Sequence, residues 1–170
     1  MPSLLRTDKE ITQIYNRHAD TVYYVCYSFM KNKPETEDMV QETFLRLITS
    51  GKTFENERHE KAWLIVTASN LCKDSLRKWW RRNENIDDHY ELAGEEDMDN
   101  PVLEAILSLP QEYKTVVYMY YYEGYSTAEI ARHLQCPHAT VRTRLARARK
   151  MLKILLGGES DEQTVRSRSL

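Results

Sequence analysis

Residues 83–100, with the sequence NENIDDHYELAGEEDMDN, divide the chain into two parts. This segment has no Lys or Arg, few aliphatic side chains and no helical period, so it cannot bury enough apolar surface to form a core. On both sides of it, apolar residues recur at helical spacing. We therefore expect two small helical domains, residues 1–82 and 101–156, joined by a flexible acidic linker, 83–100, and followed by a polar tail, 157–170.

The composition favours an all-α fold. The chain has only five glycines and five prolines, and strand-like alternation is hard to find, whereas Ala, Leu, Glu, Lys and Arg are plentiful. Ser126 followed by Glu129 forms a capping box at the start of one helix, and Pro137 suits the first position of the next. The apolar periods predict helices over residues 9–30, 35–49, 59–82, 101–110, 111–124, 125–134 and 138–155.

Bulk properties limit where such a chain works. Hydrophobic residues make up 41% of it, which is enough for a packed core. No run of about 18 apolar residues occurs, so no membrane span is expected, and the N-terminus lacks the apolar region of a secretory signal. The three cysteines are odd in number and far apart, which argues against a disulfide framework and for a reducing cytoplasm.

The sequence offers no candidate for catalysis. It contains no P-loop, nucleophile triad or metal cluster, so we predict neither enzyme activity nor a cofactor. His133, Cys136 and His138 are close together in the sequence, but no fourth ligand is nearby. We therefore predict no metal site.

Charge is distributed unevenly, although the net charge is only −2. Residues 1–82 hold 14 basic and 11 acidic side chains, residues 83–104 hold nine acidic and no basic ones, and residues 105–156 hold eight basic and three acidic ones. Five of these eight cations lie in ATVRTRLARARK, residues 139–150. One surface of the second domain is therefore strongly cationic and suits a polyanion.

This cationic segment has the pattern of the second helix of a helix-turn-helix. On a helical wheel, Val141, Leu145, Ala148 and Leu152 form one apolar stripe, which we expect to be buried. Small residues such as Ala139 lie opposite, between flanking cations. A capped first helix, a tight turn and a basic second helix are typical of a motif that places its second helix in the DNA major groove. The alternative is an ordinary solvated amphipathic helix.

Three segments of the chain resemble bacterial RNA polymerase sigma factors of the extracytoplasmic-function group, in the same order and spacing, over about residues 10–156. The run LPQEYKTVVYMYYYEGYSTAEIARHLQCPHATVRTRLARARKML is similar to the region that binds the promoter −35 element. ETEDMVQETFLRL is similar to the segment that docks on polymerase, and KAWLIVTASNLCKDSLRKWWRR to the segment that engages the −10 element. The resemblance implies a promoter-specificity factor for transcription initiation. It also implies three partners, namely core RNA polymerase (through its β′ clamp coiled coil and β flap), promoter DNA and an anti-sigma factor.

In the second domain, the resemblance assigns −35 contacts to the helix-turn-helix. His138 and Ala139 stand where relatives often carry an acidic residue and Gly. Base readout is expected at His138, Ala139, Arg142 and Thr143, and phosphate or polymerase contacts at Arg144, Arg147, Arg149 and Lys150. The predicted −35 surface comprises Ser126, Thr127, His138, Ala139, Thr140, Arg142, Thr143, Arg144, Arg147, Arg149 and Lys150.

On the second helix of the first domain, residues spaced i, i+3, i+4 and i+7 form a polar-acidic stripe with an apolar end: Asp38, Gln41, Glu42 and Leu45. Val40, Phe44 and Leu47 are expected to face the core. By itself, such a stripe is most often a solvated helix face. The resemblance implies that it is the docking site for the β′ clamp coiled coil.

The third helix has a polar side that the resemblance assigns to the −10 element. It implies that Asn70 and the preceding loop capture a base flipped from the non-template strand. Trp63 is expected to be structural, whereas Trp79 and Trp80 depart from the family pattern and either stack on DNA or close the core. The side expected to be buried comprises Leu64, Ala68, Leu71, Ser75 and Trp79. The predicted −10 surface comprises Phe54, Glu55, Asn56, Glu57, Asn70, Lys73, Asp74, Arg77 and Arg81.

Two other classes of protein remain open from the sequence. A stand-alone helix-turn-helix regulator would bind a duplex operator by itself, often a palindrome, but the acidic linker and the polar third helix argue against it. A polymerase-binding protein that blocks promoters would use the stripe on the second helix without needing two DNA-reading faces. The linker is either a solvated loop or an acidic mimic of nucleic acid, and the tail is either disordered or a regulatory extension.

Overall fold

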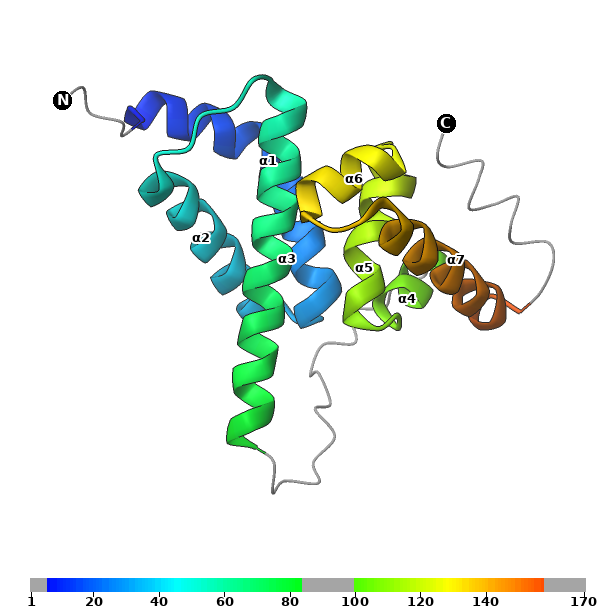
Figure 1. Ribbon diagram of the computed structural model, residues 1–170. Helices are drawn as coiled ribbons and strands as arrows, with labels where there is room; N and C mark the ends of the chain where they lie inside the picture. Colours follow the sequence, from blue (N-terminus) through cyan, green and yellow to red (C-terminus); the bar gives the residue numbers. More distant parts are fainter. Residues whose placement is uncertain (1–5, 84–99, 158–170) are drawn as a thin grey trace. The chain divides into compact units, whose positions relative to one another are not determined.

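The computed structural model describes residues 6–83 and 100–157. In these ranges the protein consists of α-helices and one short π-helix, without a strand, so the all-α prediction is confirmed (Figure 1). The chain divides into two compact units, Met1–Gly94 and Glu95–Leu170. The predicted acidic linker, 83–100, and polar tail, 157–170, lie almost entirely outside the described ranges. Only residues 83, 100 and 157 of these segments are described. No described helix is long and apolar enough to cross a membrane.

Within residues 6–83, the first unit consists of three helices: α1 (Asp8–Met30), α2 (Lys33–Ser50) and α3 (Glu57–Arg82). Each begins at a side chain that accepts a hydrogen bond from the first turn, because the first backbone N–H groups of a helix have no partner within it. These caps are Thr7, Asn32 and Asn56. The second and third helices begin two residues before the predicted positions, since the two Asn caps were not recognised in the sequence.

The core of the first unit lies where the three helices pack against one another. Val40, Phe44 and Leu47 are buried on α2, as predicted. The prediction for α3 was partly wrong, because Leu71, Ser75 and Trp79 are only half-buried. The buried stripe is rotated toward Ile65, Ser69, Cys72 and Leu76. This stripe is harder to recognise because it includes a serine, whose hydroxyl is satisfied by donating to the Ile65 carbonyl at 2.8 Å.

The second unit contains α4 (Pro101–Leu107), α5 (Gln111–Val117), the π-helix η1 (Tyr118–Tyr122), α6 (Thr127–Leu134) and α7 (His138–Leu155). The helix predicted over residues 111–124 thus changes from α to π at Tyr118. The turn after it runs through Gly124, which has a φ of 71° and so takes the left-handed conformation that glycine tolerates best. Tyr118 and Tyr122 stack within η1, with ring centroids 5.6 Å apart.

Helices α6 and α7 form the predicted helix-turn-helix. The Ser126 hydroxyl accepts from the Glu129 N–H at 3.1 Å, and the Glu129 carboxylate accepts from the Ser126 N–H at 3.2 Å, so the capping box is confirmed. Pro137 was predicted as the first residue of α7, but its ψ of 143° is extended, and it precedes the helix as its cap residue. The predicted apolar stripe of α7 is buried at every position: Val141, Leu145, Ala148 and Leu152.

Candidate nucleic-acid and protein interfaces

The surface of α7 opposite its buried stripe is solvent-exposed and cationic. Ala139 and Thr143 are exposed in its middle, and Arg142, Arg147 and Lys150 are exposed around them. The other predicted −35 residues are exposed or half-exposed as well, and none is buried. A helix with small residues at its centre and long cations at its edges can approach base edges closely while its arginines reach phosphates.

Two residues of this surface are held from within the domain. The Thr127 hydroxyl and His138 Nε2 lie 2.5 Å apart, and this hydrogen bond joins the first turn of α6 to that of α7. At the other end of α7, Arg149 Nε donates to the Tyr121 hydroxyl at 2.6 Å. The Arg149 guanidinium also lies 5.9 Å from the centre of the Tyr120 ring. The sequence predicted both α7 residues but missed Tyr121, whose only signal was the run of tyrosines in η1.

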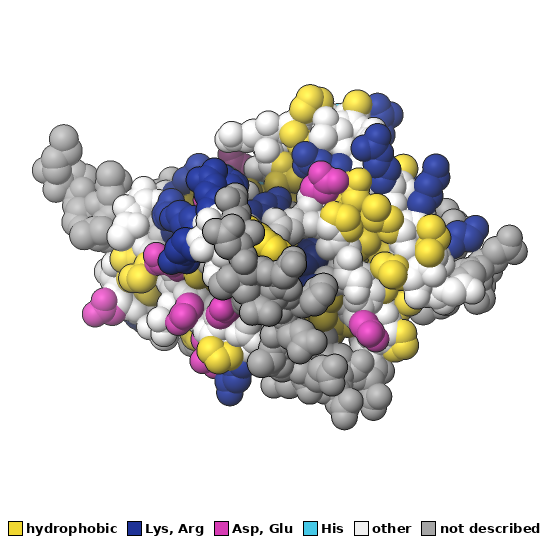
Figure 2. Space-filling model, turned by 90° about the horizontal axis from the view of Figure 1, so that it is seen from below, with side chains coloured by type: hydrophobic (Ala, Val, Ile, Leu, Met, Phe, Trp, Pro, Cys, Tyr) yellow, Lys and Arg dark blue, Asp and Glu magenta, His cyan; other side chains and the backbone are white. Residues whose placement is uncertain are grey.

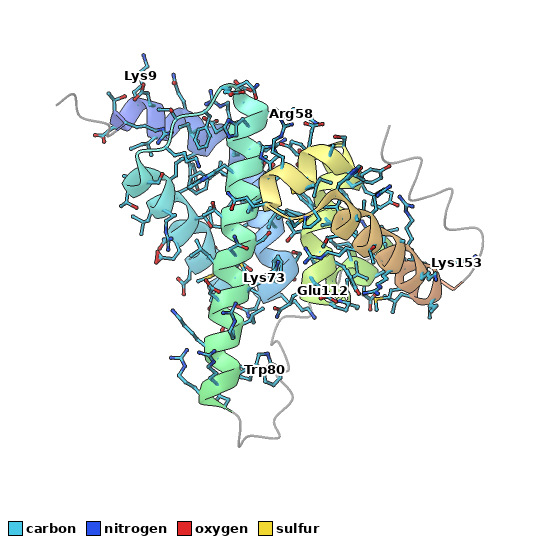
Figure 3. The ribbon with its side chains drawn as sticks, viewed as in Figure 1. Lys9, Arg58, Lys73, Trp80, Glu112 and Lys153 are labelled. Atoms are coloured by element: carbon cyan, nitrogen blue, oxygen red, sulfur yellow. The ribbon has the colours of Figure 1, made fainter. Side chains whose placement is uncertain are left out.

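A small pocket lies between the N-terminal part of α5 and α7. Ala139, Thr143 and Arg147 line its α7 side, and Glu112 and Tyr113 line its α5 side. Glu112 is exposed (Figure 3), so a carboxylate stands at one border of the cationic surface. We expect this carboxylate to keep phosphates away from that border, because like charges repel.

The stripe on α2 is also on the surface. Its members are all exposed: Asp38, Gln41, Glu42 and Leu45. Beside it, an apolar groove runs between α1 and α2, with Tyr15, Tyr23 and Leu45 in its lining. As whole residues, Tyr15 and Leu45 remain 47% and 53% exposed. Glu37 is the acidic residue in this lining. An apolar groove beside acidic side chains suits an amphipathic helix that carries basic residues.

The polar side of α3 has the predicted exposure. Asn70, Asp74, Arg77 and Arg81 are exposed, and Lys73 is half-buried. Arg77 Nη2 donates to Asp74 Oδ1 at 3.0 Å. Amide, carboxylate and guanidinium groups on one helix side can hydrogen-bond the edge of an unpaired base and its backbone.

The loop before α3 is held by contacts with the first turns of α3 that the sequence did not predict. The Phe54 ring packs against His59 and Trp63, with centroid distances of 5.3 and 5.7 Å. Asn56 Oδ1 accepts from the His59 N–H at 2.8 Å and so caps α3. The Glu55 carboxylate and Glu57 are exposed. Phe54 and Asn56 therefore have structural contacts, and Trp63 packs in the same cluster.

The two adjacent tryptophans of α3 have different environments. Trp79 is half-buried and lines a small pocket with Met30 and Leu76. Trp80 is 54% exposed, stands edge-on to Trp79 at 5.1 Å and projects from the helix (Figure 3). The last turns of α3 carry exposed cations, among them Lys78, Arg81 and Arg82, and Lys and Arg side chains gather on part of the face seen from below (Figure 2). Trp79 thus helps to close the core, while Trp80 is available at a cationic surface.

The candidate zinc residues form no site in the part of the chain that the structure describes. In that part, no group of three His, Cys, Asp or Glu side chains is placed to hold a metal ion. His138 is hydrogen-bonded to Thr127 instead.

Comparison with known families matches both units. The Sigma-70 region 2 model matches residues 14–82, and the Sigma-70, region 4 model matches residues 99–152. The ECF RNA polymerase sigma factor SigW of Bacillus subtilis (strain 168) is 31% identical over 169 residues, which cover 85% of this chain and 86% of SigW. The RNA polymerase sigma factor SigV of the same organism is 32% identical over 146 residues, covering 84% and 88%.

Two solved structures share the fold. The sigma factor RpoE from Bartonella quintana, solved with the anti-sigma factor NepR, superposes with a TM-score of 0.69 at 23% identity, covering 87% of this chain and 97% of RpoE. CnrH, solved with the cytosolic domain of CnrY, superposes with a TM-score of 0.62 at 22% identity, covering 88% and 89%.

The chain belongs to the sigma-70 family of RNA polymerase sigma factors. Within that family it is a member of the extracytoplasmic-function group, which gives it a role in promoter recognition and transcription initiation. Sigma factors are initiation factors that bind DNA and are not catalysts. Family membership thus decides against the stand-alone regulator that the sequence had left open.

Proposed function

We propose that the protein reads a bipartite promoter with two separate surfaces while a third surface holds polymerase. In this proposal α7 reads the −35 duplex, the polar side of α3 and the loop before it read the −10 strand, and the stripe on α2 docks on polymerase. The observation that carries the proposal is the exposed cationic face of α7 above a fully buried apolar stripe. A helix presented in this way can enter a major groove.

At the −35 element, the proposal divides α7 by position. Arg142 and Thr143, with His138 and Ala139 before them, lie nearest the N-terminal end and contact bases. Arg147 and Lys150 contact phosphates. Thr127 orients His138 through their hydrogen bond, and Tyr121 orients Arg149. The half-exposed Arg144 and Thr140 and the exposed Ser126, which is the cap residue of α6, complete the surface.

At the −10 element, Asn70 hydrogen-bonds a base that leaves the non-template stack, and the loop before α3 encloses it. Glu55 and Glu57 supply exposed acceptors at the loop. Lys73, Arg77 and Arg81 lie further along the helix and contact the strand backbone. Opening of the duplex draws on this binding free energy, and we expect no independent catalytic step.

The partners follow from the same surfaces. The carboxylates of Asp38 and Glu42 and the apolar end of the stripe at Leu45 fit the β′ clamp coiled coil, and the second unit contacts the β flap. The protein would then act in the cytoplasm, where core polymerase works. The Bartonella quintana sigma factor RpoE was solved with the anti-sigma factor NepR, which supports a protein of that class as a further partner of this chain.

Glu42→Lys and Asn70→Ala separate polymerase docking from strand capture in assays with core polymerase. Glu42→Lys should weaken polymerase binding at least tenfold, because it places a cation in a surface that meets basic residues. Asp20→Lys, an exposed charge reversal on α1 outside the groove lining, is the matched control and should bind normally. Unchanged binding of Glu42→Lys would remove the docking assignment.

Asn70→Ala should impair promoter opening more than polymerase binding, because its amide contacts the base only after the duplex opens. Permanganate reactivity of unpaired thymines measures opening, and co-elution with core polymerase measures binding. Equal loss in both measurements would show that Asn70 has a structural role.

A further inference from the structure

Arg6 precedes α1 in the sequence, but its side chain contacts the end of α2 and the loop that follows α2. Its Nη1 donates to the Leu47 carbonyl at 3.4 Å, and its Nη2 donates to the Lys52 carbonyl. The guanidinium carbon lies 5.4 Å from the centre of the Phe54 ring. One side chain thus connects the start of the chain to the end of α2 and to the loop that leads into α3.

The end of α2 favours a cation. Leu47 lies in the last turn of α2, where backbone carbonyls lack helical partners and the helix dipole favours positive charge. The Leu47 carbonyl also accepts from the Ser50 hydroxyl at 3.0 Å, so Arg6 adds a second donor there. That turn has no basic residue of its own. The helix stops at Gly51 in the left-handed conformation, with a φ of 62°. Arg6 supplies the missing positive charge and at the same time fixes the direction in which the chain leaves the helix.

The other end of this loop, where α3 begins, is held by contacts with α1. Arg17 of α1 lies 3.5 Å from the Glu57 carboxylate and donates to Glu60 Oε1 at 3.0 Å. The buried His18 ring lies 2.7 Å from that same Glu60 oxygen. Both ends of the connection between α2 and α3 are therefore tied to the N-terminal segment and α1, and Phe54 contacts both the Arg6 guanidinium and the Trp63 ring.

We propose that Arg6 is a positioning residue for promoter opening, which holds the loop of residues 51–56 in the geometry that receives the unpaired −10 base. This inference rests on the proposed function, in which the loop and Asn70 enclose that base. A loop ordered before binding loses less conformational freedom when the base arrives, so the base is bound more tightly. Lysine cannot replace Arg6 fully, because an ammonium group lacks the planar fork that reaches two carbonyls while covering a ring.

The test uses holoenzyme assembled from core polymerase and the full chain. The probe is a fluorescent single strand carrying the −10 element of a promoter that the holoenzyme itself selects. A second probe lacks the captured base, whose position is found by placing an abasic site at each position in turn. The variants are Arg6→Ala, Arg6→Lys, Asn70→Ala and the control Lys9→Ala, whose exposed side chain points away from the unit (Figure 3).

Arg6→Ala should weaken binding of the intact strand by about two- to tenfold, which is the effect of losing one ordered side chain. It should leave binding of the abasic strand unchanged. Arg6→Lys should give a smaller loss of the same kind, and Lys9→Ala should give none. A merely structural defect would lower the affinity for both probes together, along with polymerase binding, and that result would overturn the inference.

Asn70→Ala separates base capture by the loop and Asn70 from the positioning role of Arg6. If it loses its preference for the intact strand and Arg6→Ala keeps the preference, base capture stands and the role of Arg6 is overturned. If no variant changes the preference, or the holoenzyme has no preference, base capture by this loop fails and the inference fails with it.

Discussion

Arg142 and Arg147 are both exposed on α7, but they point to different sides of the helix and should act differently on DNA. Arg147 lies farther from the N-terminal end of α7, where phosphates are its expected target. Arg147→Ala should weaken −35 binding by a similar factor for every sequence and reduce the slope of log affinity against log salt by about 0.9.

Arg142→Ala should instead weaken the free energy of binding to the preferred −35 sequence by about 1–3 kcal/mol. The loss should be confined to one base pair, where the preference for that base is relaxed. Holoenzyme binding to a set of −35 duplexes, measured at several salt concentrations, provides both quantities. Uniform weakening by Arg142→Ala would move base readout to another residue of α7.

At the level of elements, the contact between α1 and α3 depends on a buried carboxylate. Glu60 accepts from Arg17 and pairs with the buried His18 ring. Glu60→Ala should destabilise the first unit by about 3 kcal/mol, because it leaves the buried His18 ring nitrogen without its partner and leaves Arg17 with the exposed Glu57 carboxylate alone. Glu57→Ala is the control, since the Glu57 side chain is 72% exposed and should cost less than about 1 kcal/mol.

Urea unfolding of the full chain followed by tryptophan fluorescence measures this effect. All three tryptophans lie in the first unit, so the signal reports that unit alone. Equal midpoints for the two variants would show that Glu60 contributes no more than a surface ion pair.

The cap of α1 should make stability depend on pH. Hydrogen bonds from the Thr7 backbone N–H and hydroxyl hold the pKa of Glu10 below its ordinary value of 4.5. The folded state therefore favours the carboxylate, so the contribution is complete above that value and is lost as pH falls through the lowered pKa. Glu10→Gln should reduce the loss of stability below about pH 4.5.

Thr7→Ala should reduce this acid-dependent loss of stability less than Glu10→Gln does, because the Thr7 backbone N–H remains. The same fluorescence measurement, repeated across acidic pH, compares the curves. Curves for wild type and Glu10→Gln that stay parallel would exclude the cap as the source of the dependence.

The sequence predicted some elements better than others for identifiable reasons. The buried stripe of α7 was found at each position because it consists of apolar residues at one clean period. The stripe of α3 was misplaced because Ser69 and Cys72 are buried among apolar residues, and a polar residue at a core position hides the period. The π-helix η1 leaves no signal of this kind, since a run of tyrosines fits either helix.

The site shows the same limit. The exposed residues of α2, α3 and α7 could be predicted because they share a helix face, which the sequence determines. The contacts of Arg6 with Leu47 and of Arg149 with Tyr121 join residues 41 and 28 positions apart. No local pattern reports such pairs, because they depend on how the helices pack.

For the whole molecule, the division into two units explains how a chain of net charge −2 acts on DNA. Cations are concentrated on α7 and at the end of α3, while the acidic residues of segment 83–100 offset them in the net charge. We expect weak binding of the free protein to arbitrary DNA for this reason. Specificity then arises when polymerase presents both units to one promoter.

The most direct test of the two-element account is transcription with bacterial core polymerase, this protein and a fragmented genomic template, followed by sequencing of RNA 5′ ends. The account predicts new starts that share two upstream elements at a fixed spacing. Arg142→Ala should relax the element farther from the start, and Asn70→Ala the nearer one. An absence of new starts, together with tight binding of the protein alone to a single duplex site, would contradict the account.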